Sequence, residues 1–201
     1  MRKEIKHAVV AMLALTIMLG VLYPLVITGI SQVAFSGPAN GSKVYADGKL
    51  AGSALIGQSF TTAKGNPLPQ YFQTRPSGTS PDDNDAGTSF ANYGPNSKIT
   101  AAAYKGLIQG YIALNGKYYP GGLTAAKIPA DAIQTSASGV DPQISVANAD
   151  IQAYRVAAVR QLSLATVDHL ISKYTSGRGL GFSGDPGVNV LKLNIALNEL
   201  R

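Results

Sequence analysis

The longest uncharged stretch of the chain decides where most of the remaining residues can lie. Residues 8–35 contain no Asp, Glu, Lys or Arg, and the next charged residue after them is Lys43. A helix of roughly 20 apolar residues crosses a bilayer core of about 30 Å. No later apolar run exceeds roughly ten residues without a charge or a Gly or Pro, which is well short of a span. We therefore predict one N-terminal membrane helix followed by a water-soluble domain.

Charges beside this run predict its orientation. Arg2, Lys3 and Lys6 precede it, opposed only by Glu4, whereas 36–42 is uncharged. Lys and Arg close to a span favour the cytoplasmic side, so the N-terminus is predicted to be cytoplasmic. In the cell (inner) membrane, the predicted parts are a cytoplasmic tail at 1–7, a transmembrane helix at 8–35, a linker at 36–42 and an extracytoplasmic domain at 43–201.

A cleaved signal peptide would begin with a similar charged segment. Its apolar core is about 7–15 residues long, which is much shorter than this run. The small-x-small cleavage pattern at 31–34 is also a weak match. We therefore expect an uncleaved anchor, and a mature chain beginning near Phe35 would contradict this expectation.

Four residues recur at every fourth position within the predicted span, and they are Thr16, Gly20, Pro24 and Thr28. They share one helix face, where small residues allow a second helix to approach closely. A lipid-facing anchor without a partner helix remains an equal alternative. Pro24 removes a backbone hydrogen bond, so a kink is expected.

The soluble part is predicted to be a mixed α+β domain with short strands and about three helices. Asp47-Gly48 between two short runs indicates a hairpin, and Leu55, Ile56 and Phe60 are expected in the core. Helices are predicted at 98–115, 146–161 and 164–174, capped by Ser97, Ser145 and Ser163, with a long irregular loop at 78–96 and a strand at 188–194.

Composition excludes several kinds of chemistry. The chain has no Cys, so disulfides and thiolate ligands are unavailable. Its net charge of +6 is dispersed, and no basic stripe interleaved with aromatic residues suggests a nucleic-acid partner. Asp82 to Asp85 offers oxygen ligands for calcium but lacks the spacing of an EF-hand, so a solvated loop is favoured.

Two further motifs are weak. Gly179, Gly181 and Gly184 match the GxGxxG string, but neither a strand before them nor a helix after them is predicted, so a plain loop is favoured over a dinucleotide site. No GxxxxGK[ST] phosphate loop occurs. A Ser-His-Asp triad could be built with His169, which follows Asp168, but the sequence has no GxSxG nucleophile elbow to accompany it. An anchored envelope hydrolase or ligand-binding module therefore stays a secondary hypothesis.

Three arginines are candidates for an anion or ligand site, namely Arg75, Arg155 and Arg160. The favoured interpretation is that they bind loop carbonyls or pair with Asp131 and Asp141, because a planar guanidinium satisfies several oxygens at once.

Five blocks strung in order behind a single span support a resemblance to a known family. They are GSALIGQSF (52–60), YFQTRPSG (71–78), QTSASGVDPQIS (134–145), IQAYRVAAVR (151–160) and GRGLGFSGDPGVNVLKLNIAL (177–197). The chain resembles the KdpC family, the C subunits of Kdp-type potassium-transporting P-type ATPases. The residues that carry this resemblance are Gly57, Gln58, Arg75, Pro76, Ser77, Ser138, Gly139, Asp141, Pro142, Arg155, Arg160, Gly181, Gly184 and Asn189. Three positions depart from the family pattern: Gly78 in place of Ala, Gln143 in place of His and Gly187 in place of Arg.

The resemblance implies partners and a role. The implied complex contains a potassium-binding subunit (KdpA), a P-type ATPase subunit (KdpB) and a small single-helix subunit (KdpF), and it handles both ATP and K⁺. The family's C subunit is described as a catalytic chaperone that raises the ATP affinity of the ATPase subunit. Since only 1–7 is predicted to be cytoplasmic, we expect no catalytic residue and no directly bound cofactor or metal in this chain, and an indirect effect on ATP. A purely structural anchor is a third hypothesis.

Overall fold

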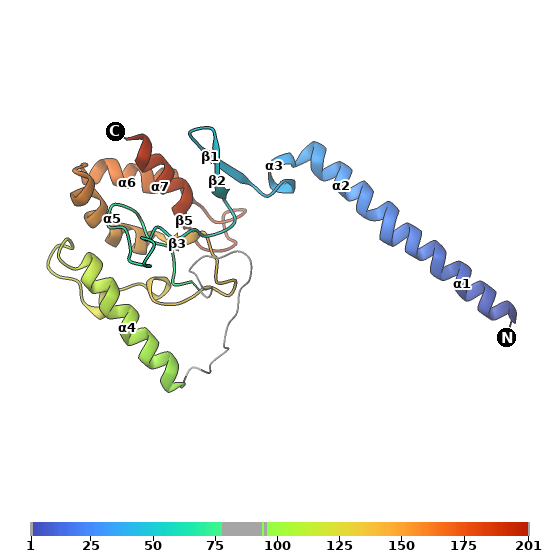
Figure 1. The fold of residues 1–201 in the computed structure, drawn as a ribbon, viewed down its shortest axis with the longest axis horizontal. Coiled ribbons are helices and arrows are strands. Elements are labelled where there is room, and N and C mark those ends of the chain that lie inside the picture. The colour runs from blue at the N-terminus through green and yellow to red at the C-terminus, as the bar shows by residue number, and fades with distance from the viewer. Residues whose placement is uncertain (1, 78–93, 95, 201) are drawn as a thin grey trace. The chain divides into compact units, whose positions relative to one another are not determined.

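The computed structural model describes residues 2–77, 94 and 96–200. The chain divides into two compact units, Met1–Lys43 and Val44–Arg201. Figure 1 traces both units from the N-terminus to the C-terminus.

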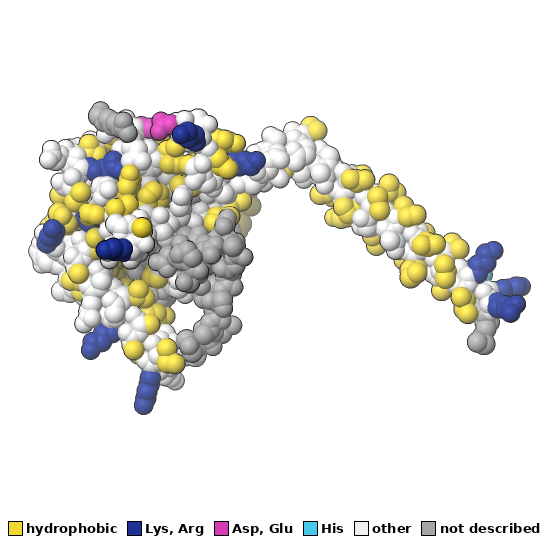
Figure 2. All heavy atoms as spheres, in the orientation of Figure 1, with side chains coloured by type: hydrophobic (Ala, Val, Ile, Leu, Met, Phe, Trp, Pro, Cys, Tyr) yellow, Lys and Arg dark blue, Asp and Glu magenta, His cyan; other side chains and the backbone are white. Residues whose placement is uncertain are grey.

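The first unit is dominated by one continuous helical segment, Arg2–Ala34, which is long and apolar enough to cross a membrane. It contains α1 (Arg2–Ile17), a π-helical turn η1 (Met18–Leu22) and α2 (Tyr23–Ala34), and the short helix α3 (Ser36–Ala39) follows. None of its side chains is buried, and apolar side chains cover much of it in Figure 2. The predicted single N-terminal apolar helix is therefore present.

The π-turn lies immediately before Pro24. The Tyr23 N–H donates to the Met18 carbonyl, five residues back, in place of the usual four. A proline ring collides with the carbonyl four residues earlier, here that of Gly20. The widened turn supplies the extra room at that carbonyl, so the helix continues through Pro24.

The second unit begins with the hairpin of β1 (Lys43–Ala46) and β2 (Lys49–Ser53). Asp47 and Gly48 have φ values of 50° and 74°. Positive φ at both central residues is typical of a type I′ turn, which matches the twist of the flanking strands. The hairpin predicted at Asp47-Gly48 is confirmed.

Helices pack around a small antiparallel sheet in the remainder of this unit. The strand order is β3-β5-β4, with Ile144 opposite Val188. The elements are α4 (Lys98–Asn115), η2 (Ala125–Lys127), η3 (Ala130–Ala132), β3 (Gln143–Ser145), α5 (Val146–Arg160), α6 (Leu164–Lys173), β4 (Thr175–Ser176), β5 (Gly187–Asn189) and α7 (Val190–Glu199). The α+β fold class with short strands is confirmed. Its core contains Phe72, Ile144, Val156, Val167, Val188, Leu193 and Leu197.

The three predicted helix caps are confirmed. The side chains of Ser97, Ser145 and Ser163 accept from the backbone N–H groups of Thr100, Asn148 and Thr166. Each hydroxyl satisfies a donor that the first helical turn leaves without a partner.

The strand predicted at 188–194 is wrong beyond Asn189. The Asn189 side chain accepts from the Lys192 N–H at 3.0 Å and so begins α7. Val190, Leu193 and Leu197 then lie in the core at helical spacing. Alternation in the sequence suggested a strand, but the Asn cap and the three- and four-residue spacing determine the structure.

The prediction that Leu55 enters the core is also wrong, because its side chain is exposed. Leu55 lies in the turn after β2, where its backbone N–H donates to the Ser53 hydroxyl at 3.1 Å. Phe60 packs against the core, as predicted.

Candidate functional site

Several of the residues that carry the family resemblance lie in, or bind, one extended segment, 69–77. It forms no strand, so its backbone groups need partners elsewhere once they are buried. Side chains of α5 and α7 supply most of those partners. This segment is therefore held by side chains of distant helices.

Two amide side chains bind this backbone as a neighbouring strand would. The Phe72 N–H donates to Asn194 Oδ1 at 2.9 Å, and Asn194 Nδ2 donates to the Phe72 carbonyl at 2.9 Å. The Gln73 N–H donates to Gln152 Oε1 at 2.8 Å, and Gln152 Nε2 donates to the Gln73 carbonyl at 3.1 Å. Asn194 and Gln152 are almost wholly buried. Each amide thus satisfies one donor and one acceptor of the segment.

Arg155 on α5 is fully buried and completes the attachment. Its NH1 donates to the carbonyls of Pro69 and Tyr71, its Nε to Asn115 Oδ1 at 2.9 Å, and its NH2 to Gln152 Oε1 at 2.8 Å. Burial lowers the pKa of Arg155 to about 10, so it stays charged at neutral pH. Neutral oxygens solvate this cation in place of water.

Arg160, the last residue of α5, joins the extended segment to α7. Its Nε donates to the Gln70 carbonyl at 2.7 Å and its NH1 to the Leu197 carbonyl at 2.8 Å. The guanidinium also lies 4.8 Å from the centre of the Tyr71 ring. The expectation that Arg155 and Arg160 bind loop carbonyls is confirmed.

A polar chain continues from Gln152 to the start of α5. Gln152 Nε2 donates to Asn148 Oδ1 at 3.0 Å, as does the Tyr111 hydroxyl at 2.8 Å. Asn148 Nδ2 donates to Asp131, whose carboxylate also accepts from the Ser145 hydroxyl at 2.8 Å. Burial raises the pKa of Tyr111, so its hydroxyl stays neutral and serves as a donor.

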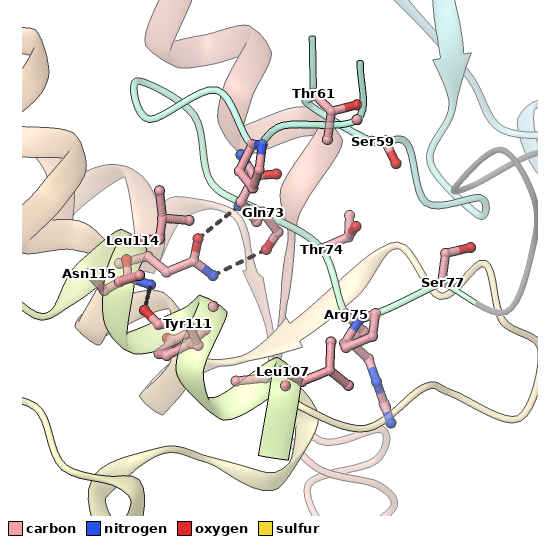
Figure 3. A pocket seen from close by; sticks show the side chains of 18 residues that line it. Ser59, Thr61, Gln73, Thr74, Arg75, Ser77, Leu107, Tyr111, Leu114 and Asn115 are labelled. Carbon is pink, nitrogen blue, oxygen red and sulfur yellow. Dashed lines mark hydrogen bonds between the residues drawn. The ribbon is translucent and has the colours of Figure 1, made fainter. Parts of the chain in front are cut away.

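A cavity of about 580 Å³ opens between this segment and α4. In Figure 3, Gln73, Thr74 and Arg75 face it from the segment, and Leu107, Tyr111 and Leu114 face it from α4. The polar atoms that Gln73, Asn115 and Gln152 present there are engaged in the hydrogen bonds described above. The cavity has the size of a small-ligand site, with mostly apolar walls.

Arg75 organises a second group of motif residues at the end of the segment. Its Nε and NH2 donate to the carbonyls of Gln134 and Thr135 at 3.3 and 3.0 Å, and its NH1 pairs with Asp141 at 3.5 Å. Next to it, the Ser77 hydroxyl donates to the Gly139 carbonyl at 3.0 Å. The predicted pairing with Asp141 is confirmed, and it joins the RPS and SASGVDP motifs.

The turn at 136–139 has its own hydrogen bonds. The Gly139 N–H donates to the Ser136 hydroxyl at 3.0 Å, with a φ of 76° that favours glycine. The Ser138 hydroxyl accepts from the Val140 N–H at 3.3 Å. Pro76 follows Arg75 and lines the cavity.

The other motif residues have separate places. The Gly57 N–H donates to the Val140 carbonyl at 2.7 Å, and the Val190 N–H donates to the Pro142 carbonyl at 3.0 Å. Gln58 is exposed, whereas Asn189 is buried and its Nδ2 donates to the Ala54 carbonyl at 2.8 Å. These contacts position loops and place no reactive group in the cavity.

Two of the positions that depart from the family pattern touch each other. A Cβ at Gly187 would stand 2.8 Å from Gln143 Oε1, so the Gln143 side chain covers the backbone there. An Arg at 187 therefore requires a different position of the side chain at 143. The third departure, Gly78, lies outside the described residues.

The candidates for other chemistry do not assemble into a site. His169 is exposed on α6, next to exposed Asp168, and does not line the cavity. Gly179, Gly181 and Gly184 belong to an exposed hairpin loop between β4 and β5. Asp82 to Asp85 falls outside the described residues. Within the part of the chain that the structure describes, no three His, Cys, Asp or Glu residues are grouped as metal ligands.

Sequence reasoning missed the amides that hold the segment. Gln152 and Asn194 occupy core-facing helical positions flanked by apolar residues, Ile151 and Ala153 for one and Leu193 and Ile195 for the other. An amide at a core-facing position is expected to bind a backbone group, because it is costly to bury unpaired. An Asn or Gln between apolar residues on the buried face of a helix therefore indicates a backbone-binding amide.

The fold and this site define a class of proteins: one N-terminal helix long and apolar enough to cross a membrane, followed by a small α+β domain whose motif residues hold its own loops in place. A family model described as "K+-transporting ATPase, c chain" matches residues 5–199. Curated KdpC subunits of potassium-transporting ATPases are 45% identical to it in Methylococcus capsulatus and 41% identical in Mycobacterium bovis, over the full length of both chains. The chain belongs to the KdpC family.

Proposed function

We propose that this chain is an accessory, non-catalytic subunit of an ATP-driven potassium uptake complex. The observation that carries the proposal is the family match, which extends over both the apolar helix and the soluble domain. Full-length similarity to proteins named as KdpC subunits supports the same assignment. The partners would be the potassium-binding subunit, the P-type ATPase subunit and the small single-helix subunit.

The site geometry supports an assembly role better than a catalytic one. Arg75, Arg155 and Arg160 are engaged by carbonyls and Asp141 of this chain. A catalytic centre needs a nucleophile, a base and a space where the reacting atom can sit near both. The cavity walls that the structure describes are lined by Gln73, Tyr111 and Gln152, whose polar atoms hold the fold together.

The effect on ATP is proposed to be indirect. With an N-terminus in the cytoplasm, 1–7 alone would face the nucleotide. A domain on the other side that caps the outer mouth of the potassium-binding subunit would act by favouring one conformation of the complex. A raised ATP affinity, the catalytic chaperone role, would then follow from a population shift rather than from a nucleotide site in this chain.

The test compares the full chain with a truncated one that keeps the helix. Removal of residues 43–201 should lower the apparent affinity of the complex for K⁺ or ATP while the helix still co-purifies with the ATPase subunit. Unchanged K⁺ affinity and ATPase rate would assign the role to the helix alone. Micromolar ATP binding by the purified full chain would contradict the indirect mechanism.

A further inference from the structure

Large apolar side chains that the soluble unit exposes are concentrated in two segments. Among its described residues they are Tyr45, Leu50, Leu55, Ile99, Leu107, Leu180, Phe182 and Leu200. Five of these eight lie in the β1–β2 hairpin, in the turn after it or in the β4–β5 loop. Apolar groups gathered in this way mark an interaction surface, whereas scattered ones need no explanation.

The two segments adjoin the same part of the domain. Asn189, at the end of β5, donates to the carbonyl of Ala54, just after β2, at 2.8 Å. A Cβ on Gly52 would stand 3.1 Å from Leu191 Cδ2. In Figure 1 the connection leading into β5 runs on the side of the domain where β1 and β2 lie.

The tip of the β4–β5 loop, residues 179–184, has a defined conformation. Gly179 and Ser183 exchange two backbone hydrogen bonds of 2.8 Å, and the Phe182 N–H donates to the Gly179 carbonyl at 3.2 Å. Arg178 and Asp185 pair at 3.0 Å across the base. The tip is thus a tight hairpin that presents Leu180 and Phe182 with exposures of 91% and 74%.

Leu180 is costly where it stands. Its φ is 53°, in the left-handed region where Gly or Asn is cheaper than a branched apolar residue. Its side chain is almost wholly exposed, so contacts within the described domain do not offset this cost. A strained, exposed Leu beside an exposed Phe indicates a target outside the domain.

We propose that the tip 179–184 inserts Leu180 and Phe182 into the surface of the bilayer that holds the N-terminal helix. The proposal rests on the membrane anchoring proposed above. Residues 35–42 separate Ala34, the last residue of α2, from Lys43, the first residue of β1, so these two Cα atoms lie at most about 32 Å apart. A tether of this length keeps the domain close to the bilayer in which the helix is inserted.

The chemistry of the tip favours lipid over a polar partner. Between Arg178 and Asp185 the tip carries no charged side chain, and those two neutralise each other. On the hairpin, exposed Tyr45 lies two residues after exposed Lys43, and exposed Leu50 directly follows exposed Lys49. Apolar residues bordered by tyrosine and lysine suit the boundary between acyl chains and head groups.

The absence of cysteine from the sequence allows a direct test. Single variants Leu180→Cys and Phe182→Cys of the full chain carry a nitroxide label in nanodiscs of phosphatidylcholine and phosphatidylglycerol. Paramagnetic resonance measures collision with oxygen, which enriches in lipid, against a water-soluble nickel chelate. The control labels are His169→Cys on the exposed face of α6 and Val26→Cys in the apolar helix.

We expect the oxygen-to-nickel ratio at 180 and 182 to exceed that at 169 several-fold and to approach that at 26. Ratios at 180 and 182 equal to that at 169, with 26 in lipid, overturn this inference and leave the anchoring intact. A water-exposed label at 26 refutes the anchoring itself. Labels that become sheltered only when partner subunits are added assign the tip to a protein contact and likewise overturn the lipid proposal.

A second measurement removes the side chains and keeps the turn. Leu180→Asn with Phe182→Ser should leave the thermal unfolding midpoint unchanged, because Asn tolerates the positive φ. We then expect the oxygen-to-nickel ratio of a label at Tyr45→Cys, measured relative to the label at 169, to fall by at least half. The matched control Ile99→Asn, on α4, should leave the label at 45 unaffected, and an equal loss in both variants would contradict the proposal.

Discussion

Helix α4 fully buries none of its apolar side chains, whereas α5 buries three polar ones together with its apolar ones. Helix α4 has 18 residues, all of them described, and the polar Asn115 is the only one that is buried. Its apolar Ile99 is 60% exposed. Along the 15 residues of α5, eight are buried, and three of those are Asn148, Gln152 and Arg155. Partners explain the difference: α5 faces a segment that needs hydrogen bonds, whereas one flank of α4 faces a cavity.

In this core, the backbone groups of a buried segment determine which side chains are buried beside it. A segment such as 69–73 enters an interior only if its N–H and C=O groups are satisfied. Polar side chains on α5 and α7 meet that need, so they are buried more completely than the apolar residues of α4. Four predictions follow from this contrast, ordered from the largest effect to the smallest.

Replacing Arg155 with Met should cause the largest loss of stability. It leaves the Pro69 carbonyl and the Asn115 side-chain oxygen without their Arg155 donors, and the Tyr71 carbonyl keeps only Gln73 Nε2 at 3.3 Å. At about 1–3 kcal/mol for each buried unsatisfied group, a loss of more than about 3 kcal/mol is expected. Chemical denaturation of the full chain in detergent measures it. Arg155→Lys should recover part of the loss, since it keeps the charge but not the planar fork.

Asn194→Leu should be the next most harmful change. Its shape is nearly conserved, but both backbone groups of Phe72 lose their partner. We expect a loss of about 2–4 kcal/mol of unfolding free energy. The control is Asn198→Leu, whose exposed side chain accepts only from Arg160 NH2 at 2.8 Å and contacts no backbone of the segment, and it should cost less than about 1.5 kcal/mol. Equal effects at 194 and 198 would show that the amide pair does not hold the segment.

Substitution of an exposed apolar residue on α4 should change stability very little. Ile99→Ser removes an exposed apolar side chain and should change the stability of the isolated chain by less than about 0.5 kcal/mol. Ile144→Ala, in the core, should cost about 2–5 kcal/mol in the same assay. A large loss at Ile99 would mean that α4 is buried in solution against something beyond the described contacts.

The smallest effect concerns the pH dependence of α5. Burial raises the pKa of Asp150, and the nearby charge of Asp168 adds to the shift. The fold therefore favours the neutral acid, and stability falls as the pH rises through this raised pKa. Asp150→Asn should raise the thermal midpoint at pH 7 slightly, and the gain should vanish near pH 3, below the usual Asp range. A gain that persists at low pH would exclude the ionisation as its cause.

Much of the fold could be predicted from local patterns, because local chemistry controls those parts. The cap residues Ser97, Ser145 and Ser163 and the Asp47-Gly48 turn each determine structure within four residues of themselves. The start of α7 could not be read this way, since Val188 to Asn194 alternates like a strand. The Asn189 cap was the competing local signal.

The site was less accessible from sequence. The sequence identifies Arg75, Arg155 and Arg160, but their partners outside α5 lie 37 to 90 residues away. Asn194 binds Phe72 across 122 residues. No periodicity reports contacts at such separations, so the hydrogen-bonded segment appeared only once the fold was known.

The pairing of Asn194 with Phe72 also affects how the protein is made. Synthesis runs from the N-terminus, so Phe72 is made 122 residues before Asn194, its partner on α7. While this helix is still inside the ribosome, the backbone at Phe72 lacks its partner and stays in water. The interior of the domain therefore closes only after α7 has been made, and a chain truncated before Asn194 would be open and protease-sensitive.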